Sequence, residues 1–155
     1  MPDSHPPFAG GYNGIRVSPQ VVSRSPGEPF MTQSDSILIN GLEFYGYHGA
    51  SDQEQTVGHR YLVDARLGVD TRIAGESDRL TDTVSYSRVA KRIIEIGTKE
   101  QFRLLEALSA RLAKMVFEEF PAIDCLTLRV QKICPPMNAI VATVGVEITR
   151  SRGEA

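Results

Sequence analysis

The feature that most constrains the fold is an alternation of apolar and polar residues between positions 59 and 71. Every second residue there is apolar, namely Tyr61, Val63, Ala65, Leu67 and Val69. A period of two gives a β-strand one apolar face and one polar face. A strand of this kind belongs to an antiparallel sheet that packs against a core on one side and meets water on the other.

Three other segments also have the character of strands. Residues 36–48 are rich in β-branched and aromatic residues, while residues 125–133 and 139–150 alternate again. Pro135 and Pro136 lie between the last two segments and fix the turn that joins them. The chain therefore supplies two strands in its first half and two near its end.

Two helices are predicted between these pairs of strands, because apolar residues recur there at helical spacing. The first begins at Ser85 or Ser87, either of which can cap it, and ends at about Gly97. The second extends from about residue 102 to residue 120, and Pro121 prevents its continuation.

The order of elements predicts an α+β domain over residues 36–150, in which two helices cover one face of a four-stranded antiparallel sheet. Residues 52–58 are expected to form a loop or short turn, and residues 72–84 a polar connection. The sheet has exposed edges, which a closed ring of subunits would pair. Residues 1–35 hold most of the prolines and are predicted to be a disordered extension, and residues 151–155 a C-terminal tail.

The composition narrows the class of protein. A chain of 155 residues suggests one domain, and a net charge of −2 argues against a nucleic-acid partner. No apolar run approaches the roughly 20 residues that span a bilayer, and no signal-peptide pattern is found. Two cysteines do not make a disulfide framework, so we predict a cytoplasmic protein without a membrane partner.

The chemistry is expected to centre on two distant regions. Residues 41–50 combine three glycines with three aromatic residues and His48, and Glu54 follows four positions later. Glycine allows close approach of another group, and aromatic rings can stack on a planar ligand. The second region supplies Lys132, so we predict that both build one site for a flat, polar heterocycle.

Lys132 continues the apolar face of its strand, so it is expected to be partly desolvated. Desolvation disfavours the charged form of an amine and makes it a usable base. Glu54 could orient a water molecule or share protons with Lys132. The alternatives are a strand-end lysine that extends into water and an ordinary loop carboxylate.

Two helix residues are further candidates. Glu106 lies beside the apolar stripe of the second helix, where a carboxylate can accept paired hydrogen bonds from the amidine-like edge of a guanine or pterin ring. Tyr86 stands at the start of the first helix and could stack on a ligand or donate a proton. A solvated glutamate and a half-buried tyrosine are the simpler interpretations.

Neither a metal nor a nucleotide cofactor is expected. His48 and His59 are not spaced as zinc ligands. The sequence contains no phosphate-binding glycine motif and no nucleophile elbow. We therefore predict a site without a metal ion, a nucleoside triphosphate or a dinucleotide.

Considered as a set, these residues resemble the dihydroneopterin aldolase family of folate biosynthesis. The resemblance spans residues 36–150 and is based on four separated motifs, which are Phe44-Tyr45-Gly46-Tyr47-His48-Gly49 with Glu54 and Gly58, Asp82-Thr83-Val84-Ser85-Tyr86, Leu104-Leu105-Glu106, and Lys132 before Pro135-Pro136. It implies the tunnelling fold, which has the element order deduced above. It also implies a ring-forming homo-oligomer, either a tetramer or an octamer of two stacked tetramers, with sites between subunits.

The resemblance further implies an aldehyde-lyase that cleaves 7,8-dihydroneopterin into 6-hydroxymethyl-7,8-dihydropterin and glycolaldehyde. This retro-aldol reaction requires neither a metal nor a Schiff base, because the imine of the dihydropterin ring accepts the electrons of the broken carbon–carbon bond. The protein supplies proton transfer and a rigid grip on the ring.

By resemblance, Lys132 is the general acid and base, which acts on the side-chain hydroxyl group through a water molecule. Glu54 is a catalytic and substrate-binding residue that lies near the substrate side chain and couples to Lys132. This chain departs from the family pattern at Ile133-Cys134, before the prolines, and at Met137-Asn138, after them. Both departures lie beside the expected pocket and leave the substrate preference open.

The remaining roles also follow from the resemblance. Glu106 would bind the 2-amino group and the adjacent ring N–H, with the Leu105 backbone nearby. Tyr86 of the neighbouring subunit would stack on the ring and relay a proton, and the Val84 backbone would touch the ring.

Two other functions stay open at this point. The related epimerase inverts a side-chain hydroxyl group of dihydroneopterin or its triphosphate by the same bond cleavage, and it would give a monapterin-type product. A catalytically silent module that only binds a purine- or pterin-like ring would not require Lys132 together with Glu54. Release of glycolaldehyde from dihydroneopterin distinguishes the aldolase from both.

Overall fold

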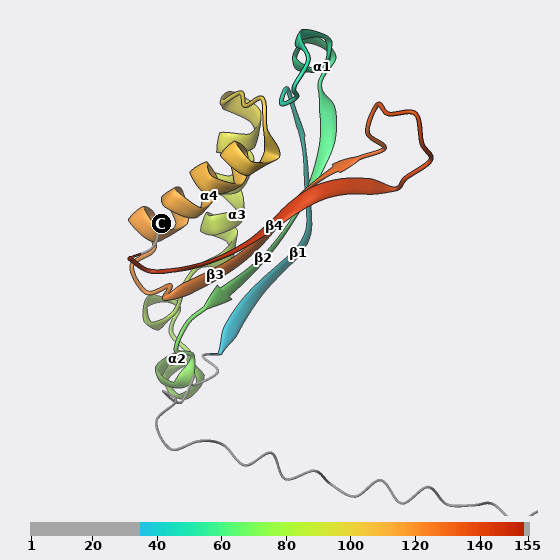
Figure 1. Ribbon diagram of the computed structural model, residues 1–155. Coiled ribbons are helices and arrows are strands. Elements are labelled where there is room, and N and C mark those ends of the chain that lie inside the picture. The colour runs from blue at the N-terminus through green and yellow to red at the C-terminus, as the bar shows by residue number, and fades with distance from the viewer. Residues whose placement is uncertain (1–34, 154–155) are drawn as a thin grey trace, which may run out of the picture. The chain divides into compact units, whose positions relative to one another are not determined.

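The structure, a computed structural model, describes residues 35–153. Predictions for residues 1–34 and 154–155 lie outside this part of the chain. The elements of the described part, drawn in Figure 1, are β1 (Ser36–Gly46), α1 (Asp52–Val57), β2 (His59–Gly68), α2 (Arg72–Ser77), the 3₁₀ helix η1 (Leu80–Asp82), α3 (Tyr86–Lys99), α4 (Leu105–Glu119), β3 (Cys125–Ile133) and β4 (Thr143–Ser151).

The four strands form an antiparallel sheet in the order β1-β2-β3-β4. Helix α3 packs against β1, and α4 packs against β3 and β4, so that both long helices cover one face of the sheet (Figure 1). The predicted α+β fold class is therefore confirmed. β1 and β4 are the edge strands, and one backbone side of each faces away from the sheet.

The alternation in β2 and β3 builds the core beneath the helices. On β2 the buried row extends from Tyr61 to Leu67, and on β3 it begins at Leu126. The antiparallel register pairs the two rows residue by residue, with Tyr61 opposite Lys132. Lys132 is thus the last member of an otherwise apolar row, which brings an amine to the end of the core.

A bulge in β1 keeps its apolar residues on the helix-covered face. The pairing with β2 shifts between Ile39 and Leu42, where β1 has one residue more than its partner. Gly41 takes a φ of 71° there, and its N–H donates a hydrogen bond of 2.7 Å to Asp64 Oδ1. The extra residue reverses the odd and even positions, so Ile39 before the bulge and Phe44 after it both face the core.

Three predictions for the first half of the chain need correction. Residues 52–57 form helix α1 rather than a loop, and the predicted polar connection over 72–84 contains α2 and η1. Helix α3 does not end at Gly97 but continues to Lys99. Gly97 is instead needed for close packing, because a Cβ atom there would lie 2.4 Å from the ring of Phe44.

The second half needed smaller corrections. Strand β4 begins at Thr143 rather than at residue 139, and α4 begins at Leu105. At the other end of β4, Ser151 still belongs to the strand. Arg152 follows and donates hydrogen bonds of 2.6–3.1 Å to backbone carbonyls at and after the end of α4, those of Phe117, Phe120 and Ile123. Among the helices of the described residues, none is long and apolar enough to cross a membrane.

Candidate active site

The strongest candidate for a site is an ion pair between Lys132 and Glu54. Lys132 is only 6% exposed, and its Nζ lies 2.7 Å from Glu54 Oε1. The predicted desolvation of Lys132 is confirmed, and so is its proximity to Glu54. An amine and a carboxylate held together at the end of a core form a unit that can exchange protons with a ligand.

The capping of helix α1 fixes the Glu54 carboxylate. Ser51 Oγ accepts a hydrogen bond from the Glu54 backbone N–H, and the backbone N–H and hydroxyl group of Ser51 donate to Glu54 Oε2 at 3.1 and 3.0 Å. One carboxylate oxygen therefore caps the helix, and the other faces Lys132. The Lys132 hydrogen bond, and next the Ser51 backbone hydrogen bond, lower the pKa of Glu54 from 4.5 to about 2. The group is an anion at neutral pH.

His48 holds the loop behind the lysine in place. Its Nε2–H donates to the Gly97 carbonyl at 2.9 Å, and its Nδ1 accepts from the Phe102 N–H at 3.2 Å. This arrangement requires the neutral imidazole. Burial lowers the pKa of His48, the bond to Gly97 opposes that change, and the charge of Lys132 lowers the pKa further. His48 is therefore a structural residue, and residues 35–153 contain no cluster suited to a metal ion.

A cavity of about 300 Å³ lies beside Glu54. Its lining residues are Ser51, Gln53, Glu54, Val57, His59 and Pro136. Burial lowers the pKa of His59, as does the charge of Lys132, while Glu54 opposes both. The volume suits a small ligand, and the lining includes the carboxylate that also holds the buried lysine.

Tyr86 and Val84 are not brought to this pair within the chain. Tyr86 is the first residue of α3, whereas Gly97 of the same helix contacts His48. Eleven residues of helix separate them, which is roughly 16 Å at about 1.5 Å per residue. Tyr86 is 64% exposed, and Val84 is buried and lines a separate cavity of about 420 Å³.

Leu105 and Glu106 form the first turn of α4. Leu105 is partly buried and packs against the core. The Glu106 side chain is exposed and makes no hydrogen bond or ion pair with any other described residue. Its carboxylate is favoured at the helix N-terminus and is available to an external donor.

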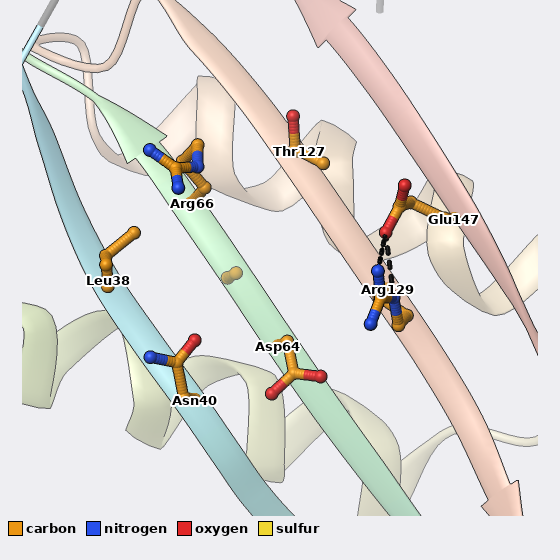
Figure 2. Close-up of a pocket in the computed structure, with 8 residues that line it drawn as sticks. Leu38, Asn40, Asp64, Arg66, Thr127, Arg129 and Glu147 are labelled. Atoms are coloured by element: carbon orange, nitrogen blue, oxygen red, sulfur yellow. Dashed lines mark hydrogen bonds and ion pairs between the residues drawn. The ribbon is translucent and has the colours of Figure 1, made fainter. Parts of the chain in front are cut away.

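A second cavity, of about 440 Å³, lies on the face of the sheet that the helices leave uncovered (Figure 2). Figure 2 shows Arg129 and Glu147 paired across β3 and β4, with Asp64 opposite Arg129 on β2 and Arg66 further along the same strand. The Arg129 and Glu147 side chains are each about half exposed, at 51% and 49%. The cavity lacks a desolvated base, so it is the weaker candidate for catalysis.

Two features around Lys132, the capping box of α1 and the hydroxyl group of Tyr61, were not predicted from the sequence. The capping box of Ser51 and Glu54 was readable from their spacing, and it would have predicted helix α1 and the orientation of the carboxylate. The hydroxyl group of Tyr61, which bonds to the His48 carbonyl at 2.5 Å, had no such signal, because Tyr61 fits the apolar row of β2 on its own.

The chain is similar to known proteins of one family. The family model described as dihydroneopterin aldolase (FolB) matches residues 37–149. The dihydroneopterin aldolase of Streptococcus pyogenes serotype M18 (strain MGAS8232) is 41% identical over 118 residues, which cover 76% of this chain and 99% of that protein. That of Bacillus subtilis (strain 168) is 34% identical over 118 residues, with 76% and 98% covered.

A solved structure is also similar. The crystal structure of Escherichia coli dihydroneopterin aldolase in complex with neopterin superposes with a TM-score of 0.70 at 26% identity. The match covers 76% of this chain and 99% of that chain. The similarity therefore extends over nearly the whole length of each of these proteins and over the part of this chain that contains Glu54 and Lys132.

Proposed function

This chain belongs to the dihydroneopterin aldolase family, and we propose that its Lys132–Glu54 pair cleaves 7,8-dihydroneopterin into 6-hydroxymethyl-7,8-dihydropterin and glycolaldehyde. The protein is thus a carbon–carbon lyase of folate biosynthesis that requires no cofactor. The observation that carries the assignment of residues is the buried ion pair of 2.7 Å beside a cavity.

The reaction requires two proton transfers. A base removes the proton of the hydroxyl group on the second side-chain carbon, the bond between the first and second side-chain carbons breaks, and its electrons move into the ring imine. An acid then returns a proton to the carbon that stays on the ring, which restores the imine. We assign both transfers to Lys132, acting through a water molecule, with Glu54 fixing the amine and that water.

The direct test is incubation of the purified protein with 7,8-dihydroneopterin and identification of the products. Glycolaldehyde and 6-hydroxymethyl-7,8-dihydropterin in equal amounts support the aldolase. A monapterin-type product alone would assign the chain to the epimerases, and the absence of any product would leave a pterin-binding module.

We further propose that Glu106 binds the ring. Its carboxylate is exposed at the start of α4 and has no partner among residues 35–153, so it can accept the parallel N–H groups of a pterin. Glu106→Ala is expected to abolish pterin binding, because the donors of the ring lose their acceptor. Glu118→Ala on the same helix is the matched control and should bind normally. Unchanged affinity in Glu106→Ala would place the anchor elsewhere.

The site is proposed to be completed by a neighbouring subunit of a ring. Tyr86 and Val84 lie at the opposite end of α3 from His48 and Lys132, and the edges of β1 and β4 are available for pairing. The neighbour's Tyr86 would then stack on the pterin while the backbone of its Val84 touches it. Sedimentation distinguishes a tetramer from an octamer.

Mixed assemblies test this arrangement. Lys132→Ala and Tyr86→Ala subunits are expected to be nearly inactive alone and to regain activity when co-assembled, because some sites then combine an intact lysine with an intact tyrosine from different chains. If mixing restores nothing although mixed oligomers form, each site lies within one chain.

A further inference from the structure

The environment of the Lys132 amine contains a group to which the proposed reaction gives no role. Tyr61 is fully buried on β2 and stands directly opposite Lys132 on β3. Lys132 Nζ lies 5.7 Å from the centre of the Tyr61 ring. The tyrosine hydroxyl donates a hydrogen bond of 2.5 Å to the His48 carbonyl, and Lys132 Nζ lies 3.4 Å from the same oxygen. Tyrosine and lysine therefore share one acceptor.

This acceptor is held rigidly. The imidazole of His48 is bonded at both nitrogens, to Gly97 and to Phe102. The next residue, Gly49, donates its N–H to the Phe102 carbonyl at 3.0 Å. The His48 carbonyl therefore cannot turn to meet Lys132, and the groups around it decide how strongly it attracts the amine.

We infer that Tyr61 is a positioning residue, whose hydroxyl group occupies the His48 carbonyl and thereby keeps the Lys132 amine directed at Glu54 and the cavity. Lys132 then makes its short bond of 2.7 Å to Glu54 and only a longer one of 3.4 Å to the carbonyl. Without the hydroxyl group, the buried carbonyl would lose its closest donor and draw the amine away from Glu54. The inference rests on the proposed function, in which Lys132 transfers the protons.

The hydroxyl group is separable from the packing of the ring. The Tyr61 ring lies 5.5 Å from that of Phe44 at an interplanar angle of 19°, a contact that phenylalanine would retain. Burial, and next the charge of Glu54, raise the pKa of Tyr61 well above its usual value. The group is therefore a neutral donor at any physiological pH and does not itself exchange protons with a ligand.

The test removes this one oxygen and compares the result with the loss of a hydroxyl group on the other face of the sheet. Thr127 lies on β3, five positions before Lys132 and therefore on the opposite face, and its Oγ1 forms a hydrogen bond of 3.1 Å with that of Thr149. Tyr61→Phe is expected to lower kcat about tenfold and to leave KM within about twofold, since the loss concerns the orientation of the amine during reaction. Thr127→Val should leave both constants unchanged.

A second measurement reports on the lysine without catalysis. In protein labelled with ¹⁵N at the lysine side chains, the Lys132 signal is expected to move in Tyr61→Phe and to stay in place in Thr127→Val. An unmoved signal together with an unchanged kcat would overturn the inference, and so would equal losses of activity in both variants. If the wild-type protein does not cleave dihydroneopterin, the proposed function fails, but the ¹⁵N signal still decides whether Tyr61 positions Lys132.

Discussion

Strand β3 carries two ion pairs that share a bond length and differ in surroundings. Lys132 pairs with Glu54 at 2.7 Å, and Arg129 pairs with Glu147 at 2.7 Å. Because three positions separate Lys132 and Arg129, they lie on opposite faces of the sheet. The side chains of the first pair are 8% and 19% exposed, and those of the second 51% and 49%.

This difference in exposure means that distance alone does not identify a reactive pair. Water screens the Arg129–Glu147 pair, so it is free to break and reform at little cost. The Lys132–Glu54 pair has lost most of its hydration, and each charge depends on the other. Only the buried Lys132–Glu54 pair couples the protonation of one group to that of its partner, as a proton-transfer site requires.

The largest expected effect is on kcat, which should depend on the buried pair and not on the exposed pair. Lys132→Ala should lower kcat by at least about 10², the usual scale of a general acid–base contribution, while pterin binding is kept. Arg129→Ala on the other face should leave kcat unchanged. Product formation from dihydroneopterin and a binding titration measure both quantities. Comparable losses in the two variants would mean that the burial of the pair has no catalytic significance.

A smaller effect concerns stability. Glu54→Gln leaves the Lys132 ammonium buried without its counter-charge and disturbs the cap of α1, so we expect the free energy of unfolding to fall by about 1–3 kcal/mol. Glu147→Gln, the matched change at the exposed pair, should stay within about 1 kcal/mol of the wild type. Denaturant unfolding at neutral pH measures both values.

The difference in free energy of unfolding between the wild type and Glu54→Gln is expected to depend on pH. The pKa of Glu54 falls from 4.5 in the unfolded chain to about 2 in the fold, so the unfolded chain binds more protons between these values. The stabilisation by Glu54 is complete above about pH 5 and is lost as the pH falls towards about 2. The gap between wild type and Glu54→Gln should therefore narrow on acidification. A gap that stays constant would contradict the lowered pKa.

How much the sequence predicts depends on how far apart the interacting residues lie. The burial of Lys132 followed from local alternation, since Leu126, Leu128 and Val130 precede it on the same face of β3. Helix α1 did not follow from periodicity, because it is six residues long and buries none of them, and only its capping box marks it in the sequence. A helix without an apolar stripe has no periodicity to detect.

Contacts between distant segments were beyond prediction from local pattern. Gly97 was interpreted as a helix end because glycine often occupies that position. In the structure its lack of a side chain lets the ring of Phe44 pack against the helix, and its carbonyl accepts a hydrogen bond from His48. The proposed meeting of Tyr86 with Lys132 of a neighbouring subunit would likewise depend on contacts between chains, which no pattern within one chain describes.

The smallest expected effect tests the exposed pair itself. Arg129→Ala removes a surface pair, and the measured change in the free energy of unfolding should lie between about 0 and 1 kcal/mol and shrink as salt is added. The stability lost in Glu54→Gln should respond much less to salt, because the side chains of the pair are only 8% and 19% exposed. If added salt reduced both losses in proportion, Lys132 and Glu54 would be as hydrated in solution as Arg129 and Glu147, and the distinction between the two faces of β3 would not hold.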